Sequence, residues 1–503
     1  MIKVELYVEL YKEHHKYSIY QFQQKKFVFP KKAPKDFPNR LGAELYVLNI
    51  LTDFLVLACK KPFKKKVNLK KFRYEITKFD SLETLKNIFL RKPRAFLYAL
   101  KEGFPGEKLD IIGVTGTKGK TSTSYIIHQI LSSEFKTALI STIEAKIENE
   151  KIDTGLHVTS PESNQIHKIL KKCLNYGIKK VILEVTSHGL YQKRAEFLNF
   201  KTAVFTNIAE DHLDYHGTFE KYLDAKSILF KKKSVKNSVL NKDDKKSFEH
   251  LSKVSAGKVF SYSLEDEKAD VFAEIIDYSI KGTKIKATIF GKEICEIFIP
   301  VPGKFYISNS LAGILVGKIY GVGNDEIKKS IESFTGVPGR MEKIDEGQNF
   351  YVFVDFAHTP ESLRALLQSV KEFKERNSRI ITVFGNAGER DKNRRKMGGV
   401  SAELSDITIL TAEDPRSEPV EEIMKEAEKY ALENGAKLNE NLFKEKDRRK
   451  AIRMAFEMAK ENDIVIITGK GHEQSMNLGK KEEWWDDRVV AMEELKKSKS
   501  KSF

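Results

Sequence analysis

From about residue 109 onward, short apolar runs alternate with amphipathic stretches. The run at 109–114 is mostly apolar, as buried strands of parallel sheets are, and a glycine-rich turn and a helical pattern over 123–131 follow it. Strands that alternate with helices in this way predict a parallel sheet with helices on both faces. The further elements expected in this region are strands at 181–185 and 202–206 and helices at 161–176 and 219–230.

The later part of the chain changes pattern before a second α/β stretch begins. Alternation over 270–300, interrupted by two glycine-containing turns, predicts a pair of antiparallel hairpins. The turn-rich junction at 336–339 then precedes further strands and helices. We therefore predict an α/β fold in three parts, with an atypical N-terminal region at 1–105, a central domain at 106–335 and a C-terminal domain at 336–503. The elements expected in the last part are strands at 351–355, 379–384, 407–410 and 463–468 and helices at 361–375, 420–433 and 447–461.

Size and composition fit an ordinary multidomain protein of the cytoplasm. At 503 residues the chain is too long for one hydrophobic core. Cys59, Cys173 and Cys295 lie far apart without CxxC spacing, which argues against a disulfide framework and fits a reducing compartment. No signal-peptide pattern opens the chain, and the longest apolar run near the start, at 51–59, contains Asp53 and is too short to span a membrane. We expect a soluble, cytoplasmic protein without membrane insertion.

The formal net charge of +17 has two possible meanings. Much of the positive charge lies in lysine-rich runs of the N-terminal region and in the tail at 496–501. Such runs could bind nucleic acid or an anionic membrane, but they are more often solvated faces of a lysine-rich protein. Because no RNA- or DNA-binding motif accompanies them, we expect no nucleic-acid partner.

The most specific chemical signal is the sequence GVTGTKGKTS at 113–122, between an expected strand and an expected helix. Such a turn lets backbone N–H groups converge on phosphate oxygens, and the helix N-terminus adds positive potential. Lys120 would supply a cation to the outer phosphates, and the Thr121 hydroxyl could reach Mg²⁺. The spacing is shorter than in the usual P-loop, since Gly116 precedes Gly119 by three positions. The residues expected to bind ATP here are Gly116, Thr117, Lys118, Gly119, Lys120, Thr121 and Ser122.

Acidic and imidazole side chains follow the next two expected strands. Glu184 lies near the end of the strand at 181–185, where parallel sheets bind ligands, so it is a candidate Mg²⁺ ligand, with a structural loop cap as the alternative. The segment 207–217 contains three acids and two histidines, which favours metal or phosphate chemistry over a solvated loop. Lys226 lies on the otherwise apolar face of the following helix, a position typical of a snorkelling side chain.

Several further short motifs accompany the phosphate loop. They are Thr159-Ser160-Pro161-Glu162, Glu184 to Leu190 with Gln192 and Arg194, Asn207 to Gly217, Asn309, Gly339-Arg340-Met341-Glu342, Asp355 to Pro360 and Gly469 to Glu473. As a set they resemble the Mur ligases, ATP-dependent enzymes that form amide bonds in peptidoglycan precursors. Within that family the chain is most similar to the tripeptide synthetases, which add the third amino acid to UDP-N-acetylmuramoyl-L-Ala-D-Glu. The resemblance covers about 104–495 and implies a central P-loop ATPase domain and a Rossmann-like C-terminal domain.

The resemblance assigns roles to individual residues. Lys226 matches a lysine that the family carries as a CO₂-derived carbamate, whose oxygens could orient a second Mg²⁺. Glu184 and His212 match the family's metal-binding positions, so the implied metal ligands are these two with Thr121 and carbamylated Lys226. The implied catalytic residues are Lys120, Glu184, His212 and Lys226. Positions that match contacts to the UDP-linked dipeptide are Thr159, Ser160, Thr186, Gln192 and Arg194, and those that match hinge and nucleotide contacts are Asn309, Arg340, Asp355 and His358.

The resemblance also bears on the amino acid that is added. Relatives that add meso-diaminopimelate carry Asp-Asn-Pro-Arg where this chain has Glu413-Asp414-Pro415-Arg416, and lysine-adding relatives generally lack the arginine. A guanidinium can bind a distal carboxylate through two bonds and would repel an ammonium group, which favours diaminopimelate. However, the acid Asp414 replaces a neutral amide and could favour a free amine, so lysine stays an alternative. The other matching positions are Arg390, Gly469 and Glu473.

The resemblance implies that ATP phosphorylates the dipeptide carboxylate and that an amine then attacks the acyl phosphate. A folylpolyglutamate synthetase or a ligase of another cell-wall polymer would share this chemistry. A non-catalytic binding module would have no use for Lys120, Glu184, His212 and Lys226 together. The family's N-terminal domain holds the UDP-sugar, yet residues 1–100 match neither its sequence nor its length. The expected partners are therefore ATP, a UDP-sugar dipeptide and an amino acid, bound by a monomer.

Overall fold

The computed structural model describes residues 3–4, 27–28, 83, 86–148, 150–152, 161–209, 213–479 and 481–500. The chain divides into two compact units, Met1–Arg94 and Ala95–Phe503. In the first unit, β1 (Lys3–Val4) pairs antiparallel with β2 (Phe27–Val28). A π-helical segment (Asn87–Arg91) precedes helix α4 (Lys92–Lys101). The second unit contains the two large sheets.

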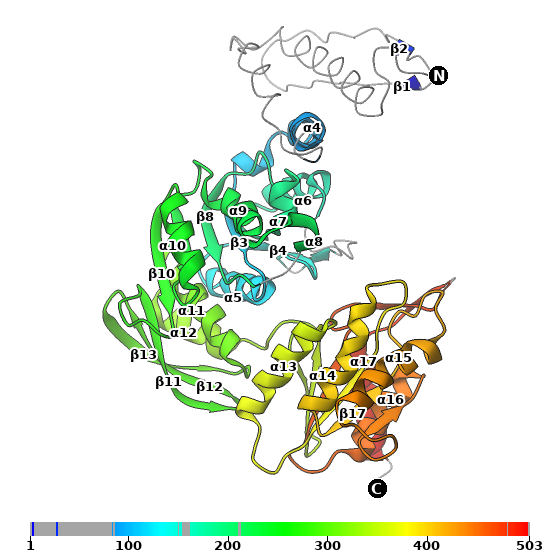
Figure 1. Ribbon diagram of the computed structural model, residues 1–503. Coiled ribbons are helices and arrows are strands. Elements are labelled where there is room, and N and C mark those ends of the chain that lie inside the picture. The colour runs from blue at the N-terminus through cyan, green and yellow to red at the C-terminus, as the bar shows by residue number, and fades with distance from the viewer. Residues whose placement is uncertain are drawn as a thin grey trace, which may run out of the picture. The chain divides into compact units, whose positions relative to one another are not determined.

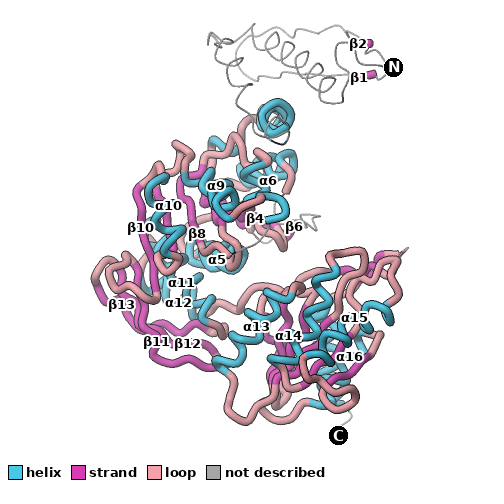
Figure 2. Tube along the Cα trace, viewed as in Figure 1, coloured by secondary structure: helices cyan, strands magenta, loops and turns pink. Residues whose placement is uncertain are grey.

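The first large sheet has 11 strands within the described residues (Figure 1). Its middle strands, from β4 through β7, β3, β8, β9 and β10 to β11, run parallel, while β5 and β6 at one edge and β12 and β13 at the other are antiparallel. The strands in spatial order are β13 (Lys292–Ile299), β12 (Gly282–Ile289), β11 (Val271–Ser279), β10 (Lys258–Ser263), β9 (Asn237–Asn241), β8 (Phe200–Phe205), β3 (Asp110–Thr115), β7 (Lys180–Glu184), β4 (Thr137–Ile140), β5 (Ala145–Ile147) and β6 (Glu150–Ile152). This confirms the expected parallel sheet and the hairpin strands over 270–300, which Figure 2 shows in magenta.

Helices cover both faces of this sheet, because successive side chains of a buried strand point to opposite sides. In β3, Ile112 packs in the cluster that contains Ile126 of helix α5 (Lys120–Ser132), whereas Ile111 packs in the cluster that contains Leu170 of helix α6 (Ser163–Asn175). Both strand residues are fully buried. The remaining helices of this region are α7 (Ser187–Tyr191), α8 (Leu213–His216), α9 (Phe219–Phe230), α10 (Lys245–Val254), α11 (Lys304–Ile319) and α12 (Asn324–Glu332), with a short 3-10 turn at Pro105–Glu107.

The second large sheet has six strands in the order β14-β15-β19-β16-β17-β18, parallel except for β14 at the edge. Its strands are β14 (Glu342–Ile344), β15 (Tyr351–Asp355), β16 (Ile380–Phe384), β17 (Ile407–Leu410), β18 (Leu442–Lys444) and β19 (Ile464–Thr468). The other elements are α13 (Pro360–Phe373), a 3-10 segment (Lys392–Lys396), α14 (Met397–Leu404), α15 (Val420–Glu433), α16 (Arg448–Met458), the hairpin β20 (Ser475–Asn477) and β21 (Glu482–Trp484), and α17 (Asp487–Ser500). Here too the four expected strands and three expected helices are confirmed.

Strand order decides which loops can form a site. In the first sheet, β3 lies between β7 and β8, so the loops that follow these three strands meet at one edge. In the second sheet, β19 lies between β15 and β16, and β17 follows β16. Parallel sheets bind ligands at the carboxyl ends of such neighbouring strands. The carboxyl ends of these central strands, in both sheets, therefore carry the sequence motifs identified above.

Some elements were not anticipated. Helix α11 is apolar on nearly every side and buried along most of its length, so it lacks the polar face that marks an amphipathic helix. Strand β4 has only four residues, all buried. The irregular pattern before residue 105 concealed helix α4. Among the helices that the structure describes, none is long and apolar enough to cross a bilayer.

Candidate active site

The phosphate-loop segment forms the turn between β3 and α5. Gly119 precedes the first turn of α5 with φ of 79°, a left-handed conformation that favours glycine. A Cβ on Gly116 would lie 1.9 Å from the Thr206 hydroxyl oxygen, so only glycine lets the loop pack against the end of β8. The first amides of a helix have no acceptor within the helix, and they carry its positive dipole end. The turn thus presents a helix N-terminus, which suits an anion, at the carboxyl ends of the strands.

Asn207, two residues after the end of β8, holds the loop in this shape. The Thr117 amide donates to the Asn207 backbone oxygen (2.8 Å), and the Lys118 amide donates to its side-chain Oδ1 (3.0 Å). The Asn207 amide nitrogen in turn donates to the Lys118 carbonyl (3.0 Å). Because the amides of 117 and 118 already have acceptors, the donors left for phosphate oxygens are those at the start of α5. The motif alone did not distinguish these two groups of amides.

Two predicted metal ligands lie together beside the loop. The Thr121 hydroxyl donates to Oε2 of Glu184 (3.0 Å), and the Thr142 amide and hydroxyl donate to the same oxygen at 3.0 and 2.8 Å. Glu184 is 2% exposed, and its Oε1 has no hydrogen-bond partner within the described parts of the chain. A buried carboxylate oxygen without a donor, next to a hydroxyl, suits a hard cation such as Mg²⁺. Sequence reasoning missed Thr142, which follows the end of β4.

Two lysines lie at the same turn. Lys120 donates from Nζ to the Thr117 carbonyl (2.9 Å), so its amine lies along the loop. Lys226, on α9 and only 1% exposed, donates from Nζ to the Gly116 carbonyl (2.6 Å) and lies 4.4 Å from the centre of the Tyr222 ring. The Tyr222 hydroxyl bonds the Thr117 hydroxyl (3.0 Å). Lys226 is therefore part of the phosphate-loop region and is no surface lysine.

His212, with Glu210 and Asp211, lies outside the described residues. Within the described part, no group of three or more His, Cys, Asp or Glu side chains could by itself hold a metal ion. From the same motif, His216 is buried and its Nε2 lies 3.1 Å from the Ser187 hydroxyl. That ring links α8 to α7, a structural role that the cluster of acids and histidines did not suggest.

The positions matched to the dipeptide gather around α7. The Thr186 hydroxyl caps this helix by accepting the Gly189 amide (3.0 Å). The Gln192 side-chain oxygen accepts from the Arg194 guanidinium, whose Nη2 also lies 3.0 Å from a Glu162 carboxylate oxygen. Thr186, Gln192 and Arg194 are therefore brought together after β7. Thr159 and Ser160 lie outside the described residues.

Asn309, on α11, contacts the phosphate-loop helix. Its Oδ1 accepts from the Thr123 hydroxyl (3.0 Å) and would be 2.6 Å from a Cβ on Gly119. Its Nδ2 is buried and has no hydrogen-bond partner among the residues described. An amide donor without an acceptor at this position suits a phosphate or nucleotide oxygen.

In the second sheet, Arg340, Asp355 and His358 surround Phe356. The Arg340 guanidinium lies 4.6 Å from the Phe356 ring centre, and His358 Nδ1 lies 2.8 Å from the Phe356 carbonyl oxygen. Asp355 accepts the amides of Met341 and Ala357, both at 2.8 Å. Burial raises the pKa of Asp355, although the Arg340 charge and these bonds oppose the shift. The carboxylate thereby joins the segment before β14 to the end of β15.

The loops after β16, β17 and β19 carry the residues matched to the amino acid. Arg416 has φ of 53° and donates from Nη1 to the Gly388 carbonyl (3.0 Å). Burial raises the pKa of Glu413 to about 8, and a Cβ on Gly469 would lie 2.1 Å from its Oε2. The glycine thus makes room for this carboxyl group. Arg394, which sequence reasoning missed, lies half-buried near Arg416, and burial lowers the pKa of its guanidinium while Glu413 opposes the shift.

A buried ion pair contacts the backbone at the start of two of these loops. Arg448 on α16 bonds Asp487 through Nε and Nη2 at 2.8 and 2.6 Å. The same guanidinium donates to the carbonyls of Ala412 (3.2 Å) and Thr468 (2.9 Å), just beyond β17 and at the end of β19. Both strand ends are therefore fixed by one side chain.

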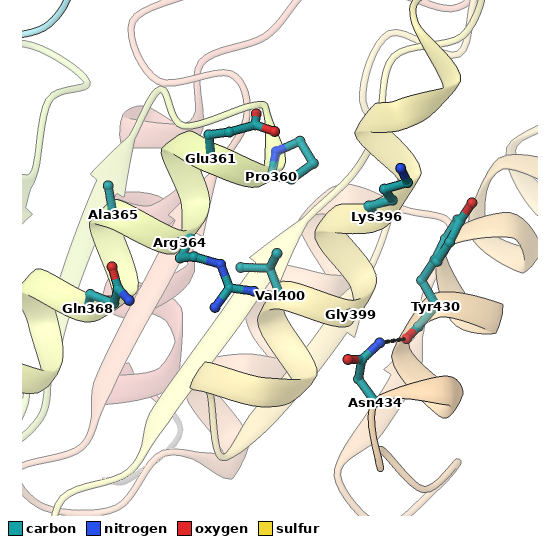
Figure 3. A pocket seen from close by; sticks show the side chains of 10 residues that line it. All are labelled: Pro360, Glu361, Arg364, Ala365, Gln368, Lys396, Gly399, Val400, Tyr430 and Asn434. Carbon is teal, nitrogen blue, oxygen red and sulfur yellow. Dashed lines mark hydrogen bonds between the residues drawn. The ribbon is translucent and has the colours of Figure 1, made fainter. Parts of the chain in front are cut away.

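A surface cavity of about 480 Å³ lies elsewhere, on the helices of the second sheet (Figure 3). Arg364, on its wall, is already paired with Glu403 at 2.8 and 2.7 Å. None of the predicted site residues lines it. The lining residues are Pro360, Glu361, Arg364, Ala365, Gln368, Lys396, Gly399, Val400, Tyr430 and Asn434.

A glycine-rich turn between a parallel strand and a helix, followed by a second parallel α/β sheet with its own polar loops, is typical of nucleotide-binding enzymes. Residues 114–317 match the Mur ligase middle domain, and residues 339–471 match the Mur ligase glutamate ligase domain. The chain belongs to the Mur ligase family of ATP-dependent ligases. The family resemblance and the expected fold are thereby confirmed.

Individual relatives agree with this placement. The UDP-N-acetylmuramoyl-L-alanyl-D-glutamate–2,6-diaminopimelate ligase of Caldanaerobacter subterraneus subsp. tengcongensis is 38% identical over 416 residues, which are 82% of this chain and 84% of the relative. A solved structure of a ligase of that name has a TM-score of 0.60 at 28% identity and covers 81% of this chain and 83% of that one. Folylpolyglutamate synthase of Mycobacterium tuberculosis, solved with ADP and AMPPCP, has a TM-score of 0.60 at 16% identity, covering 77% of this chain and 95% of its own. That last likeness shows the fold alone.

Proposed function

We propose that this protein uses ATP to join meso-diaminopimelate to UDP-N-acetylmuramoyl-L-Ala-D-Glu. The observation that carries the reaction type is the convergence of Thr121, Glu184 and Lys226 on one phosphate loop. The relative at 38% identity acts on these substrates by its name. The amino acid is argued below from Arg416.

The chain's own groups account for the first chemical step. The amides at the start of α5 and the Lys120 amine would hold the ATP phosphates and neutralise their charge. This matters because the attacking carboxylate and the phosphate are both anions. The dipeptide's terminal carboxylate attacks the γ-phosphorus in line, the P–O bond to ADP breaks, and ADP takes the electron pair. The product is an acyl phosphate.

The second step forms the amide. The neutral amine of the incoming amino acid attacks the acyl carbon, inorganic phosphate leaves with the electron pair of the C–O bond, and the proton that the nitrogen loses ends on the released phosphate. Arg194, Gln192 and Thr186 would orient the dipeptide, and Thr159 and Ser160 remain proposed contacts from the family match. Holding both reactants in line supplies much of the acceleration, because positioning replaces a bimolecular encounter.

The family depends on Mg²⁺, and the residues present fit it. Thr121 and Glu184 Oε1, which has no hydrogen-bond partner among the described residues, would hold the ion, with His212 as a further ligand. The bound ion would neutralise phosphate charge. We also propose that Lys226 carries a carbamate. Its Nζ bonds the Gly116 carbonyl at 2.6 Å, and a carbamate keeps one N–H with which to retain that bond.

Selectivity for diaminopimelate would come from Arg416. Its guanidinium lies in a group of arginines with Arg390 and Arg394, close to the buried Glu413. This concentration of positive charge suits a distal carboxylate and repels the ammonium group of lysine. Gly469 and Glu473 would contact the amine end of the amino acid, beside Asp414 and Pro415.

The test is a phosphate-release assay that crosses the UDP-linked dipeptide with diaminopimelate, lysine and glutamate. We expect release only with ATP, dipeptide and diaminopimelate together. Arg416→Ala should lower kcat/KM for diaminopimelate roughly 30- to 100-fold, since charge-assisted hydrogen bonds are worth about 2–3 kcal/mol. The control Arg376→Ala, at an exposed arginine after α13, should leave it unchanged. Equal use of lysine by the wild type would overturn the amino-acid assignment, and release with a folate substrate and glutamate would indicate a folylpolyglutamate synthetase.

The remaining expectations belong to the same proposal. We propose that the three parts at 1–105, 106–335 and 336–503 act as domains and that the enzyme works as a monomer in the cytoplasm, where ATP is supplied. The family match begins at residue 114, so the first part is the candidate holder of the UDP-sugar. Size-exclusion chromatography with light scattering tests the monomer, and a dimer mass would contradict it.

A further inference from the structure

Lys470 joins the two loops that carry the proposed amino-acid site. It follows β19 and is 1% exposed. Its Nζ lies 2.9 Å from Oδ1 of Asp414 in the loop after β17 and 2.8 Å from Oε2 of Glu473 in its own loop. The two carboxylates are partly exposed, with side chains 19% and 26% accessible. One buried ammonium group thus forms ion pairs with two carboxylates that are partly exposed to solvent.

The backbone that Lys470 contacts is held in an unusual conformation. Asp414 and Arg416 both have positive φ, 38° and 53°, although neither is glycine. Left-handed residues of this kind are strained and persist only where their surroundings hold them. Oδ1 of Asp414 accepts both the Lys470 amine and the Asn477 amide (2.9 Å). These bonds hold the turn together with two backbone bonds, from the Gly388 amide to the Asp414 carbonyl (3.0 Å) and from the Arg416 amide to the Asn477 carbonyl (3.1 Å).

Charge balance decides what Asp414 can do. Burial alone would lower the pKa of Lys470, but attraction to Glu473 and Asp414 outweighs it and raises that pKa, so the amine stays charged. One positive charge then lies against two carboxylates. This arrangement leaves a net charge of about one negative unit, which matches the single amine that must approach Glu473. Asp414 has no uncompensated charge left for a second ammonium group.

We propose that Lys470 is a positioning and specificity-determining residue, which holds the Arg416 turn and makes Asp414 a neutral acceptor toward the substrate. The inference rests on the proposed function and deepens it. Asp414 has the charge of an acid but, with Lys470 beneath it, behaves toward the substrate like the amide of the diaminopimelate-adding relatives. The distal group of the amino acid is then selected by Arg416 and its neighbouring arginines, without a contribution from the charge of Asp414.

The experiment measures kcat and KM for diaminopimelate and for lysine in four variants. Lys470→Met uncovers the Asp414 charge, so we expect at least a 10-fold rise in KM for diaminopimelate and a 10-fold shift of preference toward lysine. KM for ATP should stay within 2-fold. Lys470→Arg keeps the cation and should restore most of the loss. Asp414→Asn should leave the ratio of kcat/KM for diaminopimelate to kcat/KM for lysine within 2-fold of the wild-type ratio. Adding Asp414→Asn to Lys470→Met should return this ratio from the Lys470→Met value toward the wild-type value.

Other outcomes overturn the inference. If Asp414 attracts the substrate amine through its negative charge, Asp414→Asn raises KM on its own and its effect adds to that of Lys470→Met. Lys444→Met breaks the pair between Lys444 and Glu428 (2.6 Å) and serves as a control. If it shifts the preference toward lysine as much as Lys470→Met does, the shift is a general effect of removing a positive charge. Unfolding midpoints of the same four variants test the Lys470–Asp414 pair without substrate. If the change in the double variant equals the sum of the changes in Lys470→Met and Asp414→Asn, the two residues are not coupled. Failure of the proposed function is separate, because it appears as a wild type that turns over neither amino acid.

Discussion

Replacing Arg448 tests whether the two amino-acid loops rest on one buried ion pair. Arg448 is 2% exposed and Asp487 is fully buried, and the guanidinium makes two bonds to the carboxylate at 2.8 and 2.6 Å. It also donates to the carbonyls of Ala412 and Thr468. Arg448→Met removes all four bonds while keeping an unbranched side chain in place. The carboxylate of Asp487 would then be buried without its cation.

The expected cost follows from these contacts. Removing one partner of a buried ion pair costs about 3–5 kcal/mol, because the other charge stays buried and unpaired. Each lost bond to a carbonyl adds about 1 kcal/mol, and packing of the methionine offsets part of the sum. We expect a loss of roughly 4–6 kcal/mol, which lowers the midpoint of thermal unfolding by roughly 10–20 °C for a domain of this size.

The protein carries its own probe for this measurement. Its two tryptophans are Trp484 and Trp485, and the Trp485 indole donates to Oδ1 of Asp487 (2.8 Å). Tryptophan fluorescence during urea and thermal unfolding therefore reports on this part of the chain. Adding Asp487→Asn to Arg448→Met removes the unpaired charge but keeps an acceptor for the indole, so most of the loss should be recovered.

Two results would refute this reasoning. A cost below 1 kcal/mol for Arg448→Met would show that the pair is not a support of the loops. A double variant less stable than the single one would show that the buried charge was not the cause. Arg364→Met is the matched control, because Arg364 makes a two-bond pair with Glu403 at an exposed position and its loss should cost less than about 1 kcal/mol.

Three further predictions concern the chemistry and its pH dependence. Lys120→Ala should lower ATP-dependent phosphate release at least roughly 100-fold, as loss of a charge-stabilising donor does, and wild-type rates would refute its phosphate role. Lys226→Ala should be similarly slow and partly restored by formate or acetate, and full activity without them would remove the carbamate proposal. Glu413→Gln tests the pKa of about 8 that burial gives Glu413. Because that folded-state pKa lies above the ordinary value of 4.5, the wild type loses stability as pH rises toward and through 8. The glutamine variant should therefore match the wild type at pH 4 and exceed it at pH 9 in unfolding midpoint, and parallel curves would contradict the shift.

The chain's local patterns determined the fold and the reaction type. The apolar run at 109–114 and the glycines that follow it could be recognised because a buried strand, a tight turn and a helix start leave short-range marks. The expected strand at 202–206 became β8 at 200–205, and the helix at 219–230 was found at its expected bounds. Motif spacing singled out Lys120 and Thr121, and position at a strand end singled out Glu184, whose roles in the reaction stay predictions. These features depend on residues within one or two turns of each other.

Only the tertiary structure decided which distant groups meet. Thr142 donates to Glu184 because β4 and β7 are neighbours. Asn207 accepts hydrogen bonds from amides of the phosphate loop because β8 lies beside β3. In the same way, Lys470 in the loop after β19 pairs with Asp414 in the loop after β17. A burial pattern shows that a strand is inside but says nothing of strand order or of which counter-ion neutralises a buried charge. Those choices arise when the whole sheet assembles, because only then do hydrogen-bond donors, acceptors and charges from separate segments compete for partners.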